Sequence, residues 1–510
     1  MRLTRFYVKQ HLLLRDLDLH FDRPNRLDTD AYALDFLVGV NGSGKTTVLR
    51  ALTQIISDLR SGEYTNFDYE LEYTLADQRF PVEIGGLKPT KVQIIRHSDA
   101  KDKPSSLKIF VDDGWAKMEI TGGIELKYLP KRVVVYSSGN EAEWELLLAN
   151  TMYESVRQTL PEDLKQDPVK RALIELPGSM AENVIQTPPE GEPPFWLMRA
   201  SRLPVITLCG LLSHLSSENL PMKDVIDAVG VQAVVGFSLR FRLHTALSDR
   251  DAYNKLVAHA TRSLRQGTDY LLYFDLPKGT EFASEILNEF GSGFELYRAL
   301  DELSTENPNT GQLTLQQVSI FLQRKSASVM EENQLESDSI PGLFLFDWLS
   351  DGEQSFLGRM AMLALLDTED SLILLDEPEV HFNDYWKRRI VQLLDSIMKG
   401  HNNQILMTTH STIVISDVTA DQVFLFTKNE QGFTEVSETV SPIFGSDPGD
   451  IMINLLGTGR AGGAYSRDVL EAAIKRGDPE ELRILLSKVG PGYWQFRILD
   501  RLEGLNAASS

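Results

Sequence analysis

The residues best suited to chemistry form a glycine-rich run near the amino terminus. Residues 39–46, Gly-Val-Asn-Gly-Ser-Gly-Lys-Thr, have the spacing GxxxxGK[ST]. In such a loop, successive backbone N–H groups turn inward around a phosphate chain and the lysine reaches the β- and γ-phosphates. The hydroxyl of Thr46 can then bind Mg²⁺. The run therefore predicts a nucleotide site made by Gly39, Asn41, Gly42, Ser43, Gly44, Lys45, Thr46 and Thr47.

Two carboxylates at the end of an apolar run form a second candidate group. Residues 371–375, Ser-Leu-Ile-Leu-Leu, lead directly into Asp376 and Glu377. Acidic side chains at the mouth of a buried strand cost several kcal/mol when they lack partners. Asp376 could instead bind a metal ion, and Glu377 could orient or deprotonate an attacking water. Both carboxylates would then have a function. The alternative is a strand that simply ends in a polar turn.

Two further segments are candidates for the same site. Ser350 is followed by Glu353 at the spacing of a capping box, which accounts for the start of an apolar helix, although helix amino termini also bind anions. His410 ends the strand predicted from Ile405. A lone histidine is usually structural, but on the strand after the acidic pair it is placed to contact a γ-phosphate or the attacking water.

The elements predicted around these segments alternate between strand and helix. A buried strand is predicted at 33–38, and apolar positions recur at helical spacing from Val48 to Leu59. Alternation over 67–75 predicts a strand with one wet face, residues 107–120 predict a hairpin, and 133–136 predict a buried strand.

Changes in composition and in the predicted secondary structure along the chain indicate four regions. These are a strand-rich part at 1–140, an α+β insert at 141–340, a second strand-and-helix part at 341–440, and a helical region at 441–510. Helices are predicted at 144–160 and 161–176, and an acidic loop at 331–336. Residues 457–462 fit GxGxxG but lack a βαβ frame, so we interpret them as a loop.

Composition limits the partners and the compartment. The net charge of −22 over 510 residues disfavours nucleic-acid binding at long range, although a local basic groove stays possible. The single cysteine, Cys209, excludes an internal disulfide and suits the cytoplasm. No membrane-spanning run or signal peptide is predicted, so we expect a cytoplasmic protein.

The four segments, in this order, resemble the ABC-type ATPase heads of the SMC, RecF and OLD-like superclass, of the AAA_21 and AAA_15 type. The matches are a Walker A loop at 39–46, an LSGGQ-like signature at 349–354, a Walker B strand at 372–377 and a switch histidine at 410. The resemblance implies an α/β P-loop NTPase fold, with two lobes around a mixed sheet, an α+β insert and a helical carboxyl-terminal region. It also implies a Mg²⁺-dependent ATPase in which Thr46 and Asp376 bind the metal and Glu377 and His410 are catalytic.

The resemblance further implies a composite site, because ATP in such proteins lies between two heads. Ser350 and Gly352 of one head would face the γ-phosphate that Lys45 holds in the other. The signature that acts in trans comprises Ser350, Gly352, Glu353 and Gln354. The chain departs from the pattern in three places. Asp351 replaces a signature glycine, and residues 382–384 differ from the usual D-loop. Residues 137–140 stand where a glutamine is expected, and Ser138 or Asn140 could replace it.

The absence of sustained heptads makes the chain most similar to stand-alone ATPases of bacterial restriction and anti-phage defence systems, such as Septu and PARIS. This similarity implies self-association and a sensor or regulatory role beside a separate nuclease or toxin. Two alternatives stay open: a RecF-like repair ATPase that clamps DNA, and the motor of a membrane transporter. The transporter is disfavoured because about 300 residues separate Thr46 from Ser350.

Overall fold

The computed structural model describes most of the chain, in two compact units, Met1–Gly445 and Ser446–Ser510. The described residues are 1–22, 32–61, 65–75, 90–96, 106–111, 114–119, 128–139, 141–145, 147–148, 195–217, 220–242, 251–276, 280–304, 306–307, 312–313, 315–324, 342–366, 370–439, 442–457 and 463–509. The predicted helices at 144–160 and 161–176 lie largely outside these residues. The acidic loop and nearly all of the GxGxxG run lie outside them too.

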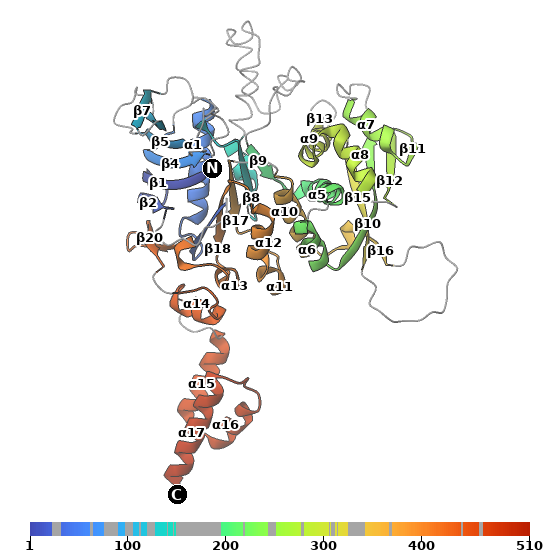
Figure 1. Ribbon diagram of the computed structural model, residues 1–510. Coiled ribbons are helices and arrows are strands. Elements are labelled where there is room, and N and C mark those ends of the chain that lie inside the picture. Colours follow the sequence, from blue (N-terminus) through green and yellow to red (C-terminus); the bar gives the residue numbers. More distant parts are fainter. Residues whose placement is uncertain are drawn as a thin grey trace, which may run out of the picture. The chain divides into compact units, whose positions relative to one another are not determined.

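A seven-stranded mixed sheet forms the centre of the first unit (Figure 1). Neighbouring strands of this sheet are parallel, except that the edge strand β20 is antiparallel to β19. The carboxyl ends of the parallel strands therefore meet at one edge. In spatial order the strands are β20 (Thr434–Glu438), β19 (Val423–Lys428), β3 (Ala33–Gly39), β18 (Gln404–Thr409), β17 (Ser371–Asp376), β8 (Arg132–Ser137) and β9 (Phe195–Met198).

Helices cover both faces of this sheet because its strands are apolar on both sides. Leu372 and Leu374 share a buried core with Leu49 and Leu52 of α1 (Lys45–Ser61). Leu375, on the opposite face, packs with side chains of α10 (Asp351–Ala364) and α12 (Ile390–Met398). Near-continuous apolar runs are what doubly covered parallel strands require. The short helices α11 (Asp384–Lys387) and α13 (Thr412–Ile415) follow β17 and β18.

A six-stranded antiparallel sheet shares its core with α1. Burial alternates along 69–75, which confirms the predicted strand with one wet face, and residues 106–119 form the predicted hairpin. The strands are β1 (Arg2–His11), β2 (Leu14–His20), β4 (Tyr69–Leu75), β5 (Thr90–Arg96), β6 (Ser106–Val111) and β7 (Gly114–Glu119).

The described residues between 199 and 345 add a third sheet and five α-helices, and α5 packs closely on α10. A Cβ on Gly210 would lie 2.5 Å from the Cβ of Ala361, so a small residue is needed where these helices cross. The helices are α5 (Leu203–Ser217), α6 (Leu220–Ala228), α7 (Asp251–His259), α8 (Thr280–Phe290) and α9 (Gly293–Leu303). The sheet contains β11 (Arg262–Gln266), β12 (Asp269–Asp275), β10 (Val231–Arg242), β15 (Leu315–Arg324) and β16 (Leu343–Leu345); β13 (Glu306–Asn307) and β14 (Gln312–Leu313) form a separate pair.

The second unit is helical, as the sequence predicts. Its core is formed by Leu470, Ala473, Leu482, Ile498 and Leu502. Its helices are α14 (Pro448–Asn454), α15 (Ala464–Arg476), α16 (Pro479–Leu486) and α17 (Tyr493–Ser509) (Figure 1). Across the described parts of both units, no helix combines the length and apolarity needed to cross a membrane.

Candidate nucleotide-binding site

The glycine loop connects β3 to α1, as its sequence predicts. β3 ends at Gly39 and α1 begins at Lys45. A Cβ on Gly39 would lie 2.2 Å from the carbonyl oxygen of Phe426, and one on Gly44 would lie 2.3 Å from Thr434 Oγ1. Gly42 and Gly44 also have φ of +78° and +102°, which side chains disfavour. Close neighbours and backbone conformation therefore both require glycine in this loop.

Lys45 is buried within the loop that precedes it. Its Nζ donates to Gly39 O at 2.7 Å and Val40 O at 3.2 Å. Burial lowers the pKa of Lys45, while the negative charges of Glu377, Asp376 and Glu379 oppose that shift. The ammonium group is thus held by its own loop and is influenced by the charges of nearby carboxylates. To bind a phosphate it would exchange two carbonyl partners for a charged one.

Asp376 accepts hydrogen bonds from three hydroxyl groups at the carboxyl edge of the sheet. Its Oδ1 accepts from Thr46 Oγ1 at 2.8 Å and Thr408 Oγ1 at 2.7 Å, and its Oδ2 accepts from Ser137 Oγ at 3.2 Å. Thr46 and Asp376 were both predicted for this site, and the structure brings them together. Carboxylate and hydroxyl oxygens are ligands that Mg²⁺ accepts, so these two residues fit a magnesium ion.

Sequence reasoning missed Ser137 and Thr408. Both lie directly opposite Asp376 in the register of the parallel strands on either side of β17. The sequence pointed to Ser138 or Asn140 in place of a glutamine. The backbone N–H of Ser138 donates to Asp376 O at 3.1 Å, whereas Asn140 lies outside the described residues. The signal that could have found Ser137 was its position as the last residue of a neighbouring strand.

Glu377 and His410 meet at the ends of adjacent strands. His410 Nδ1 lies 3.2 Å from Glu377 Oε1, and their side chains are 50% and 24% exposed. Glu377 has φ of +50°, and its N–H donates to both the carbonyl oxygen (3.2 Å) and the hydroxyl oxygen (2.9 Å) of Thr408. These bonds hold the turn that directs the carboxylate toward the histidine. An accessible imidazole–carboxylate pair can position or deprotonate a water.

Glu379 connects the loop after β17, which carries Glu377, to the loop after β18, which carries His410. It is almost fully buried, and its Oε1 accepts from Thr409 Oγ1. Thr409 Oγ1 in turn accepts from the backbone N–H of Ser411 at 2.9 Å. Burial raises the pKa of Glu379, and the hydrogen bond from Thr409 opposes the shift. The segments that carry Glu377 and His410 are thus joined by a buried polar contact.

The signature residues begin α10 and form the capping box that their spacing predicts. The backbone N–H of Ser350 donates to Glu353 Oε2 at 2.7 Å, and the N–H of Glu353 donates to Ser350 Oγ at 3.3 Å. Gln354 Nε2 donates to Leu349 O at 2.9 Å. Within the described part of one chain, no hydrogen bond or ion pair joins Ser350, Gly352, Glu353 or Gln354 to residues 39–46.

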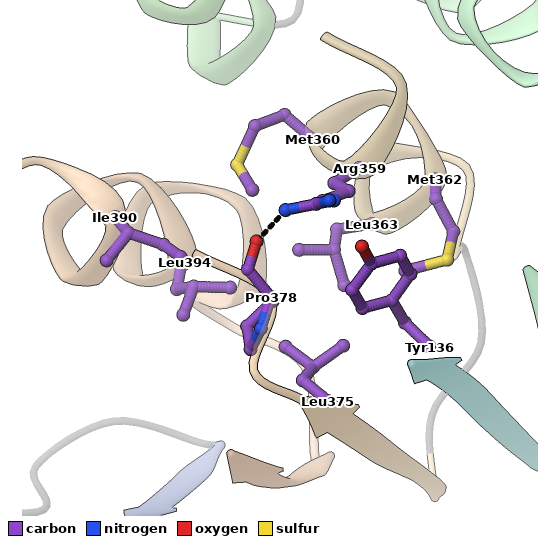
Figure 2. Close-up of a pocket in the computed structure, with 9 residues that line it drawn as sticks. All are labelled: Tyr136, Arg359, Met360, Met362, Leu363, Leu375, Pro378, Ile390 and Leu394. Atoms are coloured by element: carbon purple, nitrogen blue, oxygen red, sulfur yellow. Dashed lines mark hydrogen bonds between the residues drawn. The ribbon is translucent and has the colours of Figure 1, made fainter. Parts of the chain in front are cut away.

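Two contacts couple α10 to the loop after β17. A Cβ on Gly352 would lie 2.7 Å from His381 O, so glycine lets the helix start against that loop. Arg359, which sequence reasoning did not single out, donates through Nη1 to Pro378 O and to Val380 O at 3.0 Å. Figure 2 shows Arg359 pointing across a small cavity toward Pro378, with Tyr136 beside it.

Aromatic rings surround the buried Arg359 guanidinium. Its carbon lies 4.4 Å from the ring centre of Tyr136 and 4.8 Å from that of Phe382. Burial lowers the pKa of Arg359 and raises that of Tyr136 to about 12. The helix that begins with the signature is therefore anchored to the loop that begins with Glu377.

The strand order β19-β3-β18-β17-β8, the glycine loop and the carboxylates at the sheet edge define an α/β P-loop NTPase fold, as predicted. Residues 199–416 match the family model described as "AAA domain, putative AbiEii toxin, Type IV TA system". The match includes the signature, the strand that ends in Asp376, and also His410. It begins after the glycine loop, which therefore lies outside it.

A segment of 115 residues is 28% identical to a retron Vc95 probable ATPase of Vibrio cholerae serotype O1 biovar El Tor. The match spans 21% of this chain and 22% of that protein. The predicted resemblance to ATPases of the AAA_21 type is confirmed by these two matches.

Solved structures of SMC heads align with most of the chain at low similarity. The SMC head domain from Thermotoga maritima gives a TM-score of 0.36 at 12% identity, covering 86% of this chain and 100% of that one. A structure of an SMC head bound to the C-winged helix domain of ScpA gives a TM-score of 0.33 at 12% identity, covering 86% of this chain and 98% of that one.

Proposed function

We propose that this protein binds and hydrolyses ATP, and that two of its heads engage around the nucleotide. The observation that carries the proposal is the cluster at the carboxyl edge of the sheet. There Thr46 and Asp376 are hydrogen bonded at 2.8 Å, and Glu377 lies 3.2 Å from His410. Thr46 follows the lysine of the glycine loop, so the proposed phosphate, metal and water sites adjoin one another.

Each residue then has a task in phosphoryl transfer. Loop amides from Gly39 to Thr47 and the Lys45 ammonium bind the triphosphate, with Asn41 beside its terminal phosphate. Thr46 and Asp376 would hold Mg²⁺, which supplies a positive charge that stabilises the transferring phosphoryl group. Glu377 orients the attacking water and accepts its proton, and His410 contacts Glu377 and the γ-phosphate.

The signature residues would complete the site of a second copy. Ser350 and Asp351 are exposed at the amino terminus of α10, where an anion is stabilised by the helix dipole. In this proposal the signature of one copy, made by Ser350, Gly352, Glu353 and Gln354, lies at the site of the partner, with Ser350 and Gly352 facing the γ-phosphate held by Lys45 of that copy. The absence of a contact within one described chain fits this arrangement. Engagement would then end when ATP is hydrolysed.

We further propose a cytoplasmic role as the sensor or regulatory subunit of a defence complex with a separate nuclease or toxin. The similarity to a retron ATPase supports this proposal, and so does a family whose description names a toxin system. The single buried cysteine suits a reducing compartment. The RecF-like alternative predicts DNA affinity that rises with a nonhydrolysable ATP analogue and falls steeply with salt.

ATP binding and phosphate release by the Lys45→Ala variant test the nucleotide site. Removing the ammonium deletes the charge that the triphosphate faces, so both binding and turnover should fall to background. Lys131→Ala is a matched control, because this exposed lysine precedes β8 at the opposite edge of the same sheet. Wild-type turnover by a folded Lys45→Ala protein would overturn the site.

A further inference from the structure

The hairpin of β19 and β20 contacts the phosphate loop at each of its three glycines. Phe426 O is the nearest atom to a Cβ on Gly39, and Thr434 Oγ1 is the nearest to a Cβ on Gly44. The atom beside Gly42 is Lys428 Nζ, 3.5 Å from where a Cβ would be. Thr434 Oγ1 also donates to Ser43 O at 2.8 Å. The hairpin therefore forms one wall of the loop.

Strand register places Lys428 at this wall. β19 runs parallel to β3 with Phe426 opposite Gly39, so its last residue, Lys428, extends beyond the end of β3 toward the loop. Lys428 is also directly opposite Thr434 in the antiparallel pair. Side chains of directly opposed residues lie on the same face of a sheet, so Lys428 and the buried Thr434 both face the loop.

The turn after Lys428 is held by its own hydrogen bonds. Asn429 Oδ1 accepts from the N–H groups of Gln431 and Phe433, both at 3.0 Å. The N–H of Thr434 donates to the carbonyl oxygen of Leu13 at 2.9 Å, which attaches the hairpin to the turn between β1 and β2 of the six-stranded sheet. The backbone that carries Lys428 is thus fixed, while its exposed side chain keeps the freedom of four methylene groups.

The charge of Lys428 is unneutralised within the described structure. No carboxylate of the described residues lies within 4.0 Å of its Nζ, although the chain carries a net charge of −22. The charges of Asp376, Glu377 and Glu379, in contrast, act on the buried Lys45, although none of these three described carboxylates forms an ion pair with it. An ammonium group without a carboxylate partner beside a loop of backbone N–H groups favours an anion of high charge density.

We propose that Lys428 is a second cationic ligand of the nucleotide polyphosphate, provided by the hairpin across Gly42 from Lys45. This inference rests on the proposed ATP site and adds a residue that none of the four motifs contains. The ammonium group acts as a point charge on the polyphosphate and takes no part in proton transfer. It therefore affects nucleotide affinity more than the rate of the chemical step.

Calorimetric titration of the full chain with ADP and with a nonhydrolysable ATP analogue tests the proposal. We expect Lys428→Ala to weaken binding about 3- to 10-fold at low salt, since an exposed charge contact is worth about 1 kcal/mol. Lys428→Glu should weaken it further, and Lys428→Arg should stay near the wild type. These differences should shrink in 0.5 M salt, because exposed charges are screened.

Lys131→Ala serves again as the matched exposed-lysine control. If the wild type binds and Lys428→Ala and Lys428→Glu match that control at low salt, the Lys428 assignment is wrong while the ATP site stands. A loss of affinity that is equal at both salt concentrations would also overturn it, because it would indicate an indirect effect on the hairpin. If the wild type binds no nucleotide, both proposals fail.

Discussion

Replacing Arg359 by methionine should loosen the loop that follows Glu377 without unfolding α10. Methionine keeps much of the volume but removes the donor that holds Pro378 O and Val380 O. Each buried carbonyl left without a partner costs about 1–3 kcal/mol, and each lost cation–π contact costs about 0.5–2 kcal/mol. Relief of the desolvation cost of a buried cation offsets part of this loss. We expect a net destabilisation of the loop of about 3 kcal/mol.

Amide hydrogen exchange measures that change at the loop itself. The N–H of Val380 donates to Glu377 O at 3.1 Å, and that of Phe382 donates to Glu379 O at 3.0 Å. Because a tenfold change corresponds to about 1.4 kcal/mol, both amides should exchange on the order of 100-fold faster in Arg359→Met. ATP turnover should fall with them, since the same loop carries Glu377.

Arg389→Met is the matched control, because Arg389 also lies over an aromatic ring, that of Tyr385, which is largely exposed. An exposed cation–π contact is worth about 0.5–1 kcal/mol, so exchange in the loop should change little. If Arg359→Met leaves the exchange of Val380 and Phe382 within a factor of three of the wild type, Arg359 does not anchor the loop.

Three further predictions concern the engagement of the heads, metal binding and the contact with a second subunit. Ser350→Arg should leave ATP binding by one head intact but prevent ATP-dependent association; association and turnover at wild-type levels would leave Ser350 as a helix cap only. Asp376→Asn should lose Mg²⁺-dependent nucleotide binding together with turnover, so a titration with and without Mg²⁺ that shows unchanged affinity would contradict the metal role. Deleting the residues after Gly445 should release a co-purifying subunit and spare ATPase activity, because α17 exposes Tyr493, Phe496 and Leu499; a complex that stays intact would shift the contact to the first unit.

Local features of the site could be predicted because each depends on residues close in sequence. The glycine loop between β3 and α1 requires only its own spacing and the apolar residues on either side. The capping box of Ser350 and Glu353 likewise lies within one helical turn. The positions of Asp376 and His410 at the ends of buried strands also followed from local apolar runs.

The supporting residues could not be predicted because they are determined by strand order. Ser137 and Thr408 reach Asp376 only because β8 and β18 lie on either side of β17. Lys428 reaches Gly42 only because β19 lies beside β3, nearly 400 residues later in the chain. Arg359 lies in a segment predicted to be an apolar helix, and nothing in the sequence indicated that its charged side chain would be buried. Such contacts depend on register and packing, which one sequence does not specify.

The central claim is that ATP holds two heads together until Glu377 activates a water. Size-exclusion chromatography with light scattering, in Mg·ATP, tests it on Glu377→Gln, which keeps the shape of the side chain but removes the base. Losing a positioned base costs on the order of 10²–10⁴ in rate, so phosphate release should nearly stop while ATP stays bound. We expect this variant to form a stable ATP-bound dimer or larger assembly. A monomer with wild-type phosphate release would contradict it.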